Sequence, residues 1–314
     1  MTTPKFGRNY QLVVQTNTGQ PIIQIPMLPQ ASSSPFLNIS LPLTIEFDII
    51  RNVLSSANTS TIRVYNLSQA HRNAIRKNVN DWGNVRTVQL YAGYGTSLPL
   101  IFSGNISQAW SWRDGVNFIT QIEAFDAGWN FINSEVSLSF AAQTPRVNIA
   151  QALIALLNGV QLGAIGSAIQ GNIPRGNSYS GNAINLLREL SGNGFYIDNQ
   201  KAYILADNEY LQSAQIAQVS ASDGLLNTPV LEQTIMHFDM LFEPKLKIGQ
   251  LLNLQSQTEP ILNGNYKVVS LGHKGTISAA VCGEAVTNVG LLAPYAGTSL
   301  QATYESNLTP VAGS

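Results

Sequence analysis

The sequence predicts a mainly β protein that carries one α+β insert. Short runs in which apolar and polar residues alternate occur near both ends of the chain, which is the pattern of half-buried strands. Residues 139–206 instead contain two helical patterns and a Gly-rich stretch. Of the 314 residues 44% are hydrophobic, which excludes a wholly disordered chain. We therefore expect β-rich regions at 1–138 and 207–290, a small α+β domain at 139–206, and a C-terminal extension at 291–314.

The first region is predicted to be almost entirely β. The dipeptide Asp114-Gly115 between two alternating runs predicts a tight hairpin. Only residues 68–79 have a helical pattern there. The predicted strands are 10–16, 20–25, 43–51, 60–65, 87–94, 98–109 and 116–126.

The predicted helix at 68–79 follows a strand with no Gly or Pro between them. Ser68 is a good N-cap, and Leu67 before it can fold the helix against the sheet. Arg72, Arg76 and Lys77 then lie on the exposed side, the last two near the C-terminal end, where the helix dipole favours cations. We predict that these three cations dock an acidic subunit or partner, although a solvated face is the alternative. The other basic residues of this region are scattered, so sequence-specific nucleic-acid binding is not predicted.

The insert begins with an uncharged stretch, residues 149–171, that needs to be compared with a membrane span. Gln151 and Asn158 interrupt it, and glycines are frequent in its second half. We predict a helix at 145–158, capped by Thr144 and followed by a flexible loop. Its apolar stripe is Ile149, Leu153, Leu156 and Leu157. Stable membrane insertion, as in a membrane-active ejection protein, is the less favoured interpretation.

The rest of the insert has a second helix and a hairpin. Ser180 or Asn182 can cap a helix through Leu190, and Gly192 or Gly194 then ends it. The runs 195–198 and 201–205 are expected to pair over Asn199-Gln200.

The second β region, up to residue 289, consists of alternating runs separated by turn signals. These signals lie at Pro244, Gly249, Asn263-Gly264 and Lys274-Gly275. The segment after residue 290 has one charge and many small residues, so it is expected to be an extension or tail.

Nothing in the sequence indicates an active site. His71, His237 and His273 lie outside the spacings that bind metals or activate a nucleophile. Cys282, the only cysteine, is expected to be a small core residue. We therefore predict no catalytic residue, no cofactor and no metal site, and a protein that is not an enzyme.

Two groups of side chains leave an alternative open. Glu123 and Asp126 form a carboxylate pair of a kind that is common by chance in β proteins, so catalysis is not predicted from it. Trp110 and Trp112 share one strand face and could stack on a sugar, although a core or interface layer is the favoured interpretation.

Charge is scarce and unevenly distributed. Charged residues make up 11% of the chain, against about 25% in ordinary soluble proteins, while Asn and Gln number 29 and 22. Residues 1–113 have nine Lys/Arg and three Asp/Glu (+6), and residues 114–314 have eight and fifteen (−7). A neutral polar surface is cheap to bury, and a basic front with an acidic back favours head-to-tail association.

Three segments resemble the baseplate hub proteins of contractile-tailed bacteriophages. "IRVYNLSQAHRNAI" resembles that family's strand followed by a Ser-capped helix. "GLLNTPVLEQTIMHFDMLFEPKLKIGQLLNL" with "NGNYKVVSLGHKG" resembles its closing β-domain, and "TPRVNIAQALIALL" with "YSGNAINLLREL" resembles its α+β insert. The matches extend from about residue 44 to residue 276, with nothing recognised in 1–40 or 290–314.

The resemblance implies a structural virion protein with two tube-like β-barrel domains flanking the small α+β domain. It implies a homotrimer that joins the sixfold tail tube to the threefold central spike and lines a channel for genome ejection. The implied partners are the tail tube or its initiator, the spike, the baseplate wedge proteins and the tape-measure protein. Its location is the phage baseplate, with assembly in the host cytoplasm. The alternative from another class is a β-rich glycan-binding or wall-degrading tail component.

Overall fold

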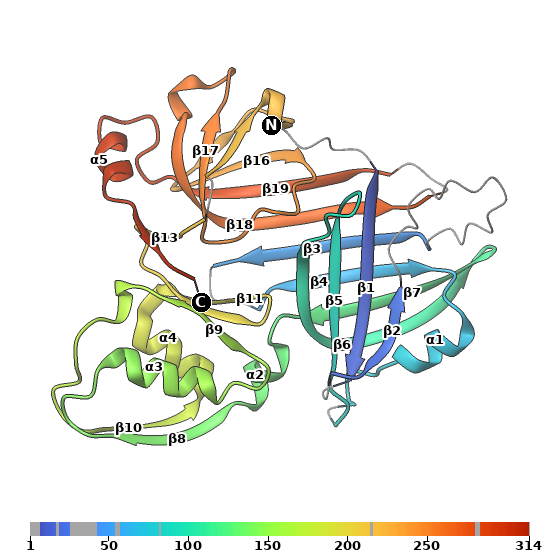
Figure 1. Cartoon of the computed structure of the whole chain (residues 1–314), viewed down its shortest axis with the longest axis horizontal. Coiled ribbons are helices and arrows are strands. Elements are labelled where there is room, and N and C mark those ends of the chain that lie inside the picture. The colour runs from blue at the N-terminus through green and yellow to red at the C-terminus, as the bar shows by residue number, and fades with distance from the viewer. Residues whose placement is uncertain are drawn as a thin grey trace.

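The computed structural model describes residues 7–16, 19–25, 43–53, 57–81, 83–213, 216–279 and 283–313. Within these ranges the expected mainly β fold with an α+β insert is confirmed, and one sheet of thirteen strands extends through most of the molecule. Figure 1 shows an N-terminal lobe and a C-terminal lobe side by side along this sheet, with the α+β unit at one side. Cys282 and most of residues 1–40 lie outside the described ranges.

The N-terminal lobe is a sheet that folds over on itself. Its strand order is β3-β4-β7-β6-β5-β1-β2, all antiparallel. β1 and β5 cross in front of β3 and β4 in Figure 1, and Tyr10, Phe102 and Ile62 are buried between the layers. The strands are β1 (Arg8–Thr16), β2 (Pro21–Ile25), β3 (Ile45–Asn52), β4 (Thr59–Tyr65), β5 (Arg86–Tyr94), β6 (Leu100–Asp114) and β7 (Asn117–Phe125). The hairpin at Asp114-Gly115 is confirmed, with Asp114 opposite Asn117 and Gly115 at φ +56°.

Helix α1 (Gln69–Ile75) is shorter than predicted, and Asn66 makes the turn that precedes it. Ser68 caps the helix as expected, since its Oγ accepts a hydrogen bond from the His71 N–H (3.2 Å). Asn66 adopts φ +59°, a left-handed conformation usually reserved for Gly. Its N–H donates to the Phe118 carbonyl (2.7 Å), and its Oδ1 accepts from the Phe118 N–H (3.0 Å). A strand therefore leads directly into a helix because Asn66 reverses the chain and holds it on β7.

We expect Asn66→Ala to lower the free energy of unfolding by about 1–2 kcal/mol, because Ala disfavours the left-handed conformation and lacks the Oδ1 acceptor. Asn66→Gly loses only the side-chain bonds and is the matched control. Urea denaturation of both variants measures the difference. An Ala variant as stable as the Gly variant would contradict this account of the turn.

The α+β unit comprises residues 127–206, and three of its predicted details are wrong. Helix α3 (Arg146–Ala155) has Pro145 at its N-cap position, while the Thr144 hydroxyl donates back to the Ala141 carbonyl (2.8 Å). Leu156 is 51% exposed and so does not belong to the buried stripe. The expected flexible loop contains strand β9 (Gln161–Ile165), which pairs parallel to β12 (Lys201–Ile204). A parallel partner forty residues away leaves no local sequence signal, which is why this strand was missed.

The remaining elements of the unit agree better with expectation. Helix α4 (Ala183–Ser191) is capped by Asn182 and ends at Gly192, which adopts φ +63°. The hairpin of β11 (Phe195–Asp198) and β12 forms over Asn199-Gln200, both at positive φ. The other elements are α2 (Gly128–Asn133), which was not expected, β8 (Glu135–Phe140), β10 (Asn177–Asn182), and the 3-10 helices η1 (Ser167–Ile169) and η2 (Gly192–Gly194).

The C-terminal lobe corrects two predictions. Lys274-Gly275 is not a turn but lies inside the long strand β18. The glycine is required there because a side chain at Gly275 would collide with Ala285 and Phe47. The segment after residue 290 is part of the lobe, since β19 runs to Leu292 and β20 pairs with β13. The elements are β13 (Glu209–Leu211), β14 (Ala217–Ser220), η3 (Ala221–Asp223), β15 (Val230–Glu232), β16 (Ile235–Leu241), β17 (Leu251–Gln255), η4 (Pro260–Leu262), β18 (Gly264–Ile277), β19 (Ala285–Leu292), α5 (Gln301–Ser306) and β20 (Thr309–Val311).

Strand β18 joins the two lobes. Its first residues pair with β17 of the C-terminal lobe, and after an irregularity near Val268 its second half pairs with β3 of the N-terminal lobe. Phe242, which follows β16, is fully buried in the N-terminal core against Phe47 and Tyr94. The lobes therefore share both a backbone ladder and a core residue.

Candidate functional site

One side of the large sheet is open to solvent and is continuous across both lobes. Cross-strand partners place the following residues in one row on this side: Leu241, Val286, Lys274, Asp48, Thr61, Glu123 and Gln108. Partners in register point to the same side of a sheet, so seven strands contribute to this row. We call this surface, formed by β16, β19, β18, β3, β4, β7 and β6, the open face.

The open face is polar and predominantly acidic. Its acidic side chains are Glu46, Asp48, Glu123, Asp239 and Glu284, against Arg63 and Lys274. Arg63 lies 3.8 Å from Glu46 and donates to the Gln121 amide oxygen (2.9 Å). A shallow hollow of about 430 Å³ near Ile50 contains Asp48, Asp239 and Lys274. A polyanion would therefore find few unpaired cations on this surface.

The open face ends in two free strand edges. The strand order ends at β15, whose outer side has no partner strand in the described part of the chain. At the other end, residues 111–114 of β6 pair with β7 alone among the described residues, since β5 covers only 100–105 and Lys77 bridges Ala109. Unpaired N–H and C=O groups at such edges can bind another strand.

The two edges differ in charge and carry apolar side chains on the open face. Arg113 is exposed at the β6 edge, and Glu232 is exposed at the β15 edge. Val230 (53% exposed) pairs with His237 on the same side as the open face. Trp112 (37% exposed) stands at the opposite edge. Both edges thus present a strand and an exposed apolar side chain on the open face, while Glu232 lies on the open face and Arg113 on the reverse side.

Trp110 and Trp112 do share one strand face. Their ring centroids are 6.4 Å apart with an interplanar angle of 28°, and each ring is about one-third exposed. Together they cover Gln121, the cross-strand partner of Trp110, which is 8% exposed.

The three cations predicted for docking lie together at α1 but differ in exposure and in the contacts that their side chains make. Arg76 is exposed. Arg72 is half-buried, with its guanidinium 4.0 Å from the Phe118 ring centroid and bonded to the Leu67 carbonyl (2.8 Å). Lys77 donates to the Asp81 and Asn84 carbonyls (2.9 and 2.6 Å), and desolvation lowers its pKa. Arg113 of β6 also lies near Phe118, with its guanidinium carbon 5.9 Å from the centroid of that ring.

The hairpin of β11 and β12 lies where all three cores meet. Phe195, Ile197 and Ile204 pack inside the α+β unit. Tyr196 belongs to the core of the C-terminal lobe, where its ring stacks on Tyr203 with centroids 5.1 Å apart. The alternation of a strand therefore inserts one hairpin between two cores.

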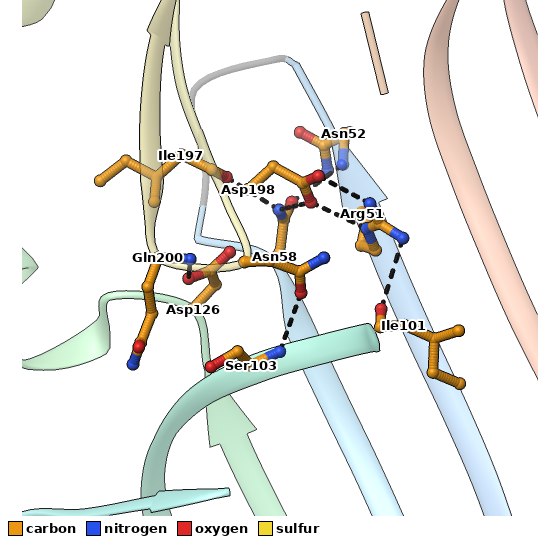
Figure 2. A network of polar contacts seen from close by, with 10 residues as sticks. Arg51, Asn52, Asn58, Ile101, Ser103, Asp126, Ile197, Asp198 and Gln200 are labelled. Atoms are coloured by element: carbon orange, nitrogen blue, oxygen red, sulfur yellow. Dashed lines mark hydrogen bonds and ion pairs between the residues drawn. The ribbon is translucent and has the colours of Figure 1, made fainter. Parts of the chain in front are cut away.

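The tip of this hairpin meets the N-terminal lobe through a buried polar network, shown in Figure 2. Arg51, 1% exposed, donates from Nε and Nη2 to the two carboxylate oxygens of Asp198 (2.8 and 2.6 Å). Its Nη1 donates to the Ile101 carbonyl (3.3 Å). Asn58 donates to the Ile197 carbonyl (2.9 Å), and the Gln200 N–H donates to Asp126 Oδ1 (2.9 Å). We call Arg51, Asn58, Asp126 and Asp198 the junction.

A second polar contact attaches the α+β unit to the C-terminal lobe. Glu209 accepts hydrogen bonds from the Ser167 and Ala206 N–H groups (2.7 and 2.8 Å). Lys267 of β18, 4% exposed, donates to the Ala206 carbonyl (2.7 Å), and burial lowers its pKa to about 8. The unit is thus held at both lobes by buried polar groups.

The candidate catalytic groups of the sequence do not converge. His273 is fully buried inside β18, not in a turn, with Nδ1 3.0 Å from the Thr287 hydroxyl, and burial lowers its pKa to about 3. Glu123 lies on the open face, whereas Asp126 is buried in the junction. Among the described residues, no three His, Cys, Asp or Glu side chains are placed to hold a metal. No helix in the described ranges is long and apolar enough to cross a membrane.

The family model for the baseplate hub gp41 matches residues 28–276, which is most of the chain. The chain belongs to this baseplate hub family. It is therefore a structural protein of a phage baseplate, a component of the virion tail, and the resemblance seen in the sequence is confirmed.

Solved structures similar to this hub protein share its fold at very low sequence identity. The prophage MuSo2 43 kDa tail protein from Shewanella oneidensis is 9% identical, with a TM-score of 0.58 over 92% of this chain and 98% of that one. A tail protein from Neisseria meningitidis is 8% identical, with a TM-score of 0.54 over 97% and 100%. The E. coli c3393 protein, a type VI secretion component described as similar to T4 tail proteins gp27 and gp5, is 9% identical, with a TM-score of 0.52 over 83% and 76%. None of the curated proteins matches the sequence.

Sequence reasoning missed the residues that connect the units of the hub protein. Arg51 ends an alternating strand, and Asp198 precedes the predicted hairpin turn, but nothing in the sequence connected them. The one available signal was an Arg at the end of a strand predicted to be half-buried. Val230 carried no signal, because a free edge is defined only once the strand order is known.

Proposed function

We propose that three copies of this hub protein close head to tail into a ring, by pairing β15 of one copy with residues 111–114 of β6 in the next. The observation that carries the proposal is the pair of free strand edges at opposite ends of the open face, each with an exposed apolar side chain on that face, Trp112 at one and Val230 at the other. A contact between two different surfaces of the same chain is heterologous and closes into a ring when the rotation allows it. Pairing would also cover Trp112 and Val230, which are exposed in a single copy.

In this ring each copy presents two β lobes, so that three copies offer six similar lobes to a sixfold tail tube and threefold symmetry to the central spike. The open face then lines the channel for the tape-measure protein and the genome. Its acidic character supports this role, because DNA binds proteins chiefly through phosphate contacts with Lys and Arg. The cations Arg72, Arg76 and Lys77 at α1 lie outside this face and dock an acidic neighbour such as a baseplate wedge or tube protein. Assembly takes place in the host cytoplasm.

Charged substitutions at the two edges test the ring. We expect Trp112→Glu and Val230→Glu each to weaken trimer formation about tenfold or more, since each places a charge among the apolar side chains that the contact covers. Analytical ultracentrifugation of the full chain, with and without the spike protein, measures the oligomer.

Arg146→Glu is the matched control, since Arg146 is exposed at the start of α3, away from both edges. It should assemble like the unchanged protein. Trimers of unaltered stability in both single edge variants would exclude this contact, and a protein that stays monomeric with the spike present would exclude the ring itself.

A glycan-binding role is the second candidate, and the stacked Trp110–Trp112 pair is the observation that favours it. Sugar rings pack on exposed aromatic faces, and the neighbouring Arg63, whose side chain is exposed, offers hydrogen-bond donors for hydroxyl groups. Loss of glycan-array binding in Trp112→Ala, with assembly intact, would support this role. Loss of assembly without any glycan binding supports the ring.

A further inference from the structure

The junction holds two carboxylates and one guanidinium in a sealed space between units. Asp126 and Asp198 are 1% and 6% exposed, and Arg51 is 1% exposed. Asp198 already occupies Arg51 with two hydrogen bonds. With both acids ionised the junction carries one more negative charge than Arg51 balances.

The ionisable groups that act on Asp126 come from three strands. β3 contributes Arg51, β11 contributes Asp198, and β12 contributes Tyr203. Tyr196 and His273 interact with Arg51 instead, and burial keeps His273 neutral. Lys201 of β12 lies opposite Asp198 across the hairpin, and Arg51 is the cation that binds the Asp198 carboxylate.

The two oxygens of the Asp126 carboxyl differ in their hydrogen bonding. Oδ1 accepts the Gln200 N–H (2.9 Å), whereas the buried Oδ2 has no hydrogen-bond partner in the described part of the chain. Desolvation is the main cause that raises the pKa of Asp126 to about 7, and the neighbouring Asp198 raises it further, while the backbone hydrogen bonds and Arg51 oppose the rise. A proton on this carboxyl removes the unbalanced charge.

Asp126 contacts both the N-terminal lobe and the hairpin tip of the α+β unit, so its protonation bears on whether the two separate. Its own N–H donates to the Asn58 carbonyl of the N-terminal lobe (2.8 Å), and its carboxylate binds the hairpin tip of the α+β unit. Moving the hairpin away from the N-terminal lobe would expose this carboxyl to water, where an ordinary carboxylate is ionised.

We propose that the junction is a proton-dependent latch between the α+β unit and the N-terminal lobe. The closed latch holds a proton on Asp126, and opening the hairpin releases that proton to water. The latch is therefore tight in acid and loosens as pH rises to neutral. This gives the hub a way to couple a movement of the α+β unit to pH, independently of whether the ring proposed above forms.

The direction of the effect follows from linkage. A carboxyl whose pKa is raised in the closed state contributes its full stabilisation below the open-state pKa of about 4, and loses it as pH rises through the closed-state pKa. For Asp126 that window ends at about pH 7. Within it, one proton released on opening changes the opening equilibrium by about tenfold per pH unit.

Hydrogen exchange of the full chain between pH 5 and 8.5, corrected for the intrinsic exchange rate, tests the latch. We expect opening of β11 and β12 to rise by about tenfold per pH unit up to pH 7 and then to level off. Asp126→Asn mimics the protonated acid and keeps the Gln200 contact, so it should stay protected at pH 8. Glu189→Gln, at an exposed position of α4 in the same unit, is the matched control and should behave like the unchanged protein.

Equal pH dependence in the unchanged protein and in Asp126→Asn would overturn the proposal. A second measurement needs no variant and so does not depend on how Asp126→Asn folds: the carboxyl carbon of Asp126 in the unchanged protein is titrated by NMR. Titration near pH 7 supports the latch, and titration below pH 5 overturns it whatever the variants do.

Discussion

Replacing Arg51 by Met should destabilise the protein by about 3–5 kcal/mol, because it leaves the Asp198 carboxylate buried without its partner. Both carboxylate oxygens of Asp198 lose a charge-assisted hydrogen bond, and Asp126 remains beside it as a second acid. Urea denaturation of the full chain measures the loss.

Two controls separate the buried pair from ordinary surface electrostatics. The double variant Arg51→Met/Asp198→Leu removes both charges together and should recover most of the loss, as buried pairs replaced by apolar groups often do. Arg63→Met breaks the 3.8 Å contact with Glu46 on the open face and should cost about 0–1 kcal/mol. If Arg51→Met lowers the stability no more than Arg63→Met does, the junction does not hold the units together.

Phe242→Ala should cost about 3–5 kcal/mol, because it empties a fully buried ring site that the surrounding core cannot refill. The Phe242 ring centroid lies 5.7 Å from that of Phe47 and 6.1 Å from that of Tyr94. The Tyr94 hydroxyl also donates to the Phe242 carbonyl (2.8 Å). The residue follows a strand of the C-terminal lobe yet fills the core of the N-terminal lobe, so its loss weakens the connection between them.

The matched control is Phe125→Ala, since Phe125 is 40% exposed and its ring leaves water only in part. Its cost should be clearly smaller, in proportion to the apolar area buried. Tryptophan fluorescence reports the N-terminal lobe through Trp110 and Trp112 and the α+β unit through Trp129, and far-UV circular dichroism reports the whole chain. Coincident transitions are expected for the unchanged protein, because β18 belongs to both lobes. Two separate transitions in the unchanged protein would contradict a shared sheet.

The features that the sequence predicted correctly depend on contacts within a few residues. The β6–β7 hairpin turns directly after Asp114, at Gly115 with φ +56°, and the β11–β12 hairpin turns over Asn199-Gln200, both at positive φ. Asn182 caps α4 by accepting from the Ile184 and Asn185 N–H groups, two and three residues away. Such signals are local, so neighbouring residues are enough to reveal them.

The wrong predictions concern positions at which a distant partner decided the outcome. Gly275 indicated a turn, but β3 and β19 pair with β18 on both sides and continue the strand through it. Leu156 fits the spacing of a buried stripe, yet it is 51% exposed. The docking role of Arg72, Arg76 and Lys77 stays a prediction, and the structure adds that Arg72 and Lys77 also bind carbonyls of their own chain.

The sequence by itself determined the mainly β class, the position of the α+β insert, the family and most hairpins and caps, because alternation, turn residues and capping residues act locally. Only the tertiary structure decided which edges of the sheet stay free and which charges are buried. Arg51 and Asp198 are 147 residues apart, and Trp112 and Val230 lie at free edges only because of the order of strands between them. Burial and pairing are properties of the whole packed chain, so the latch and the ring edges could be identified only after the three cores had been placed together.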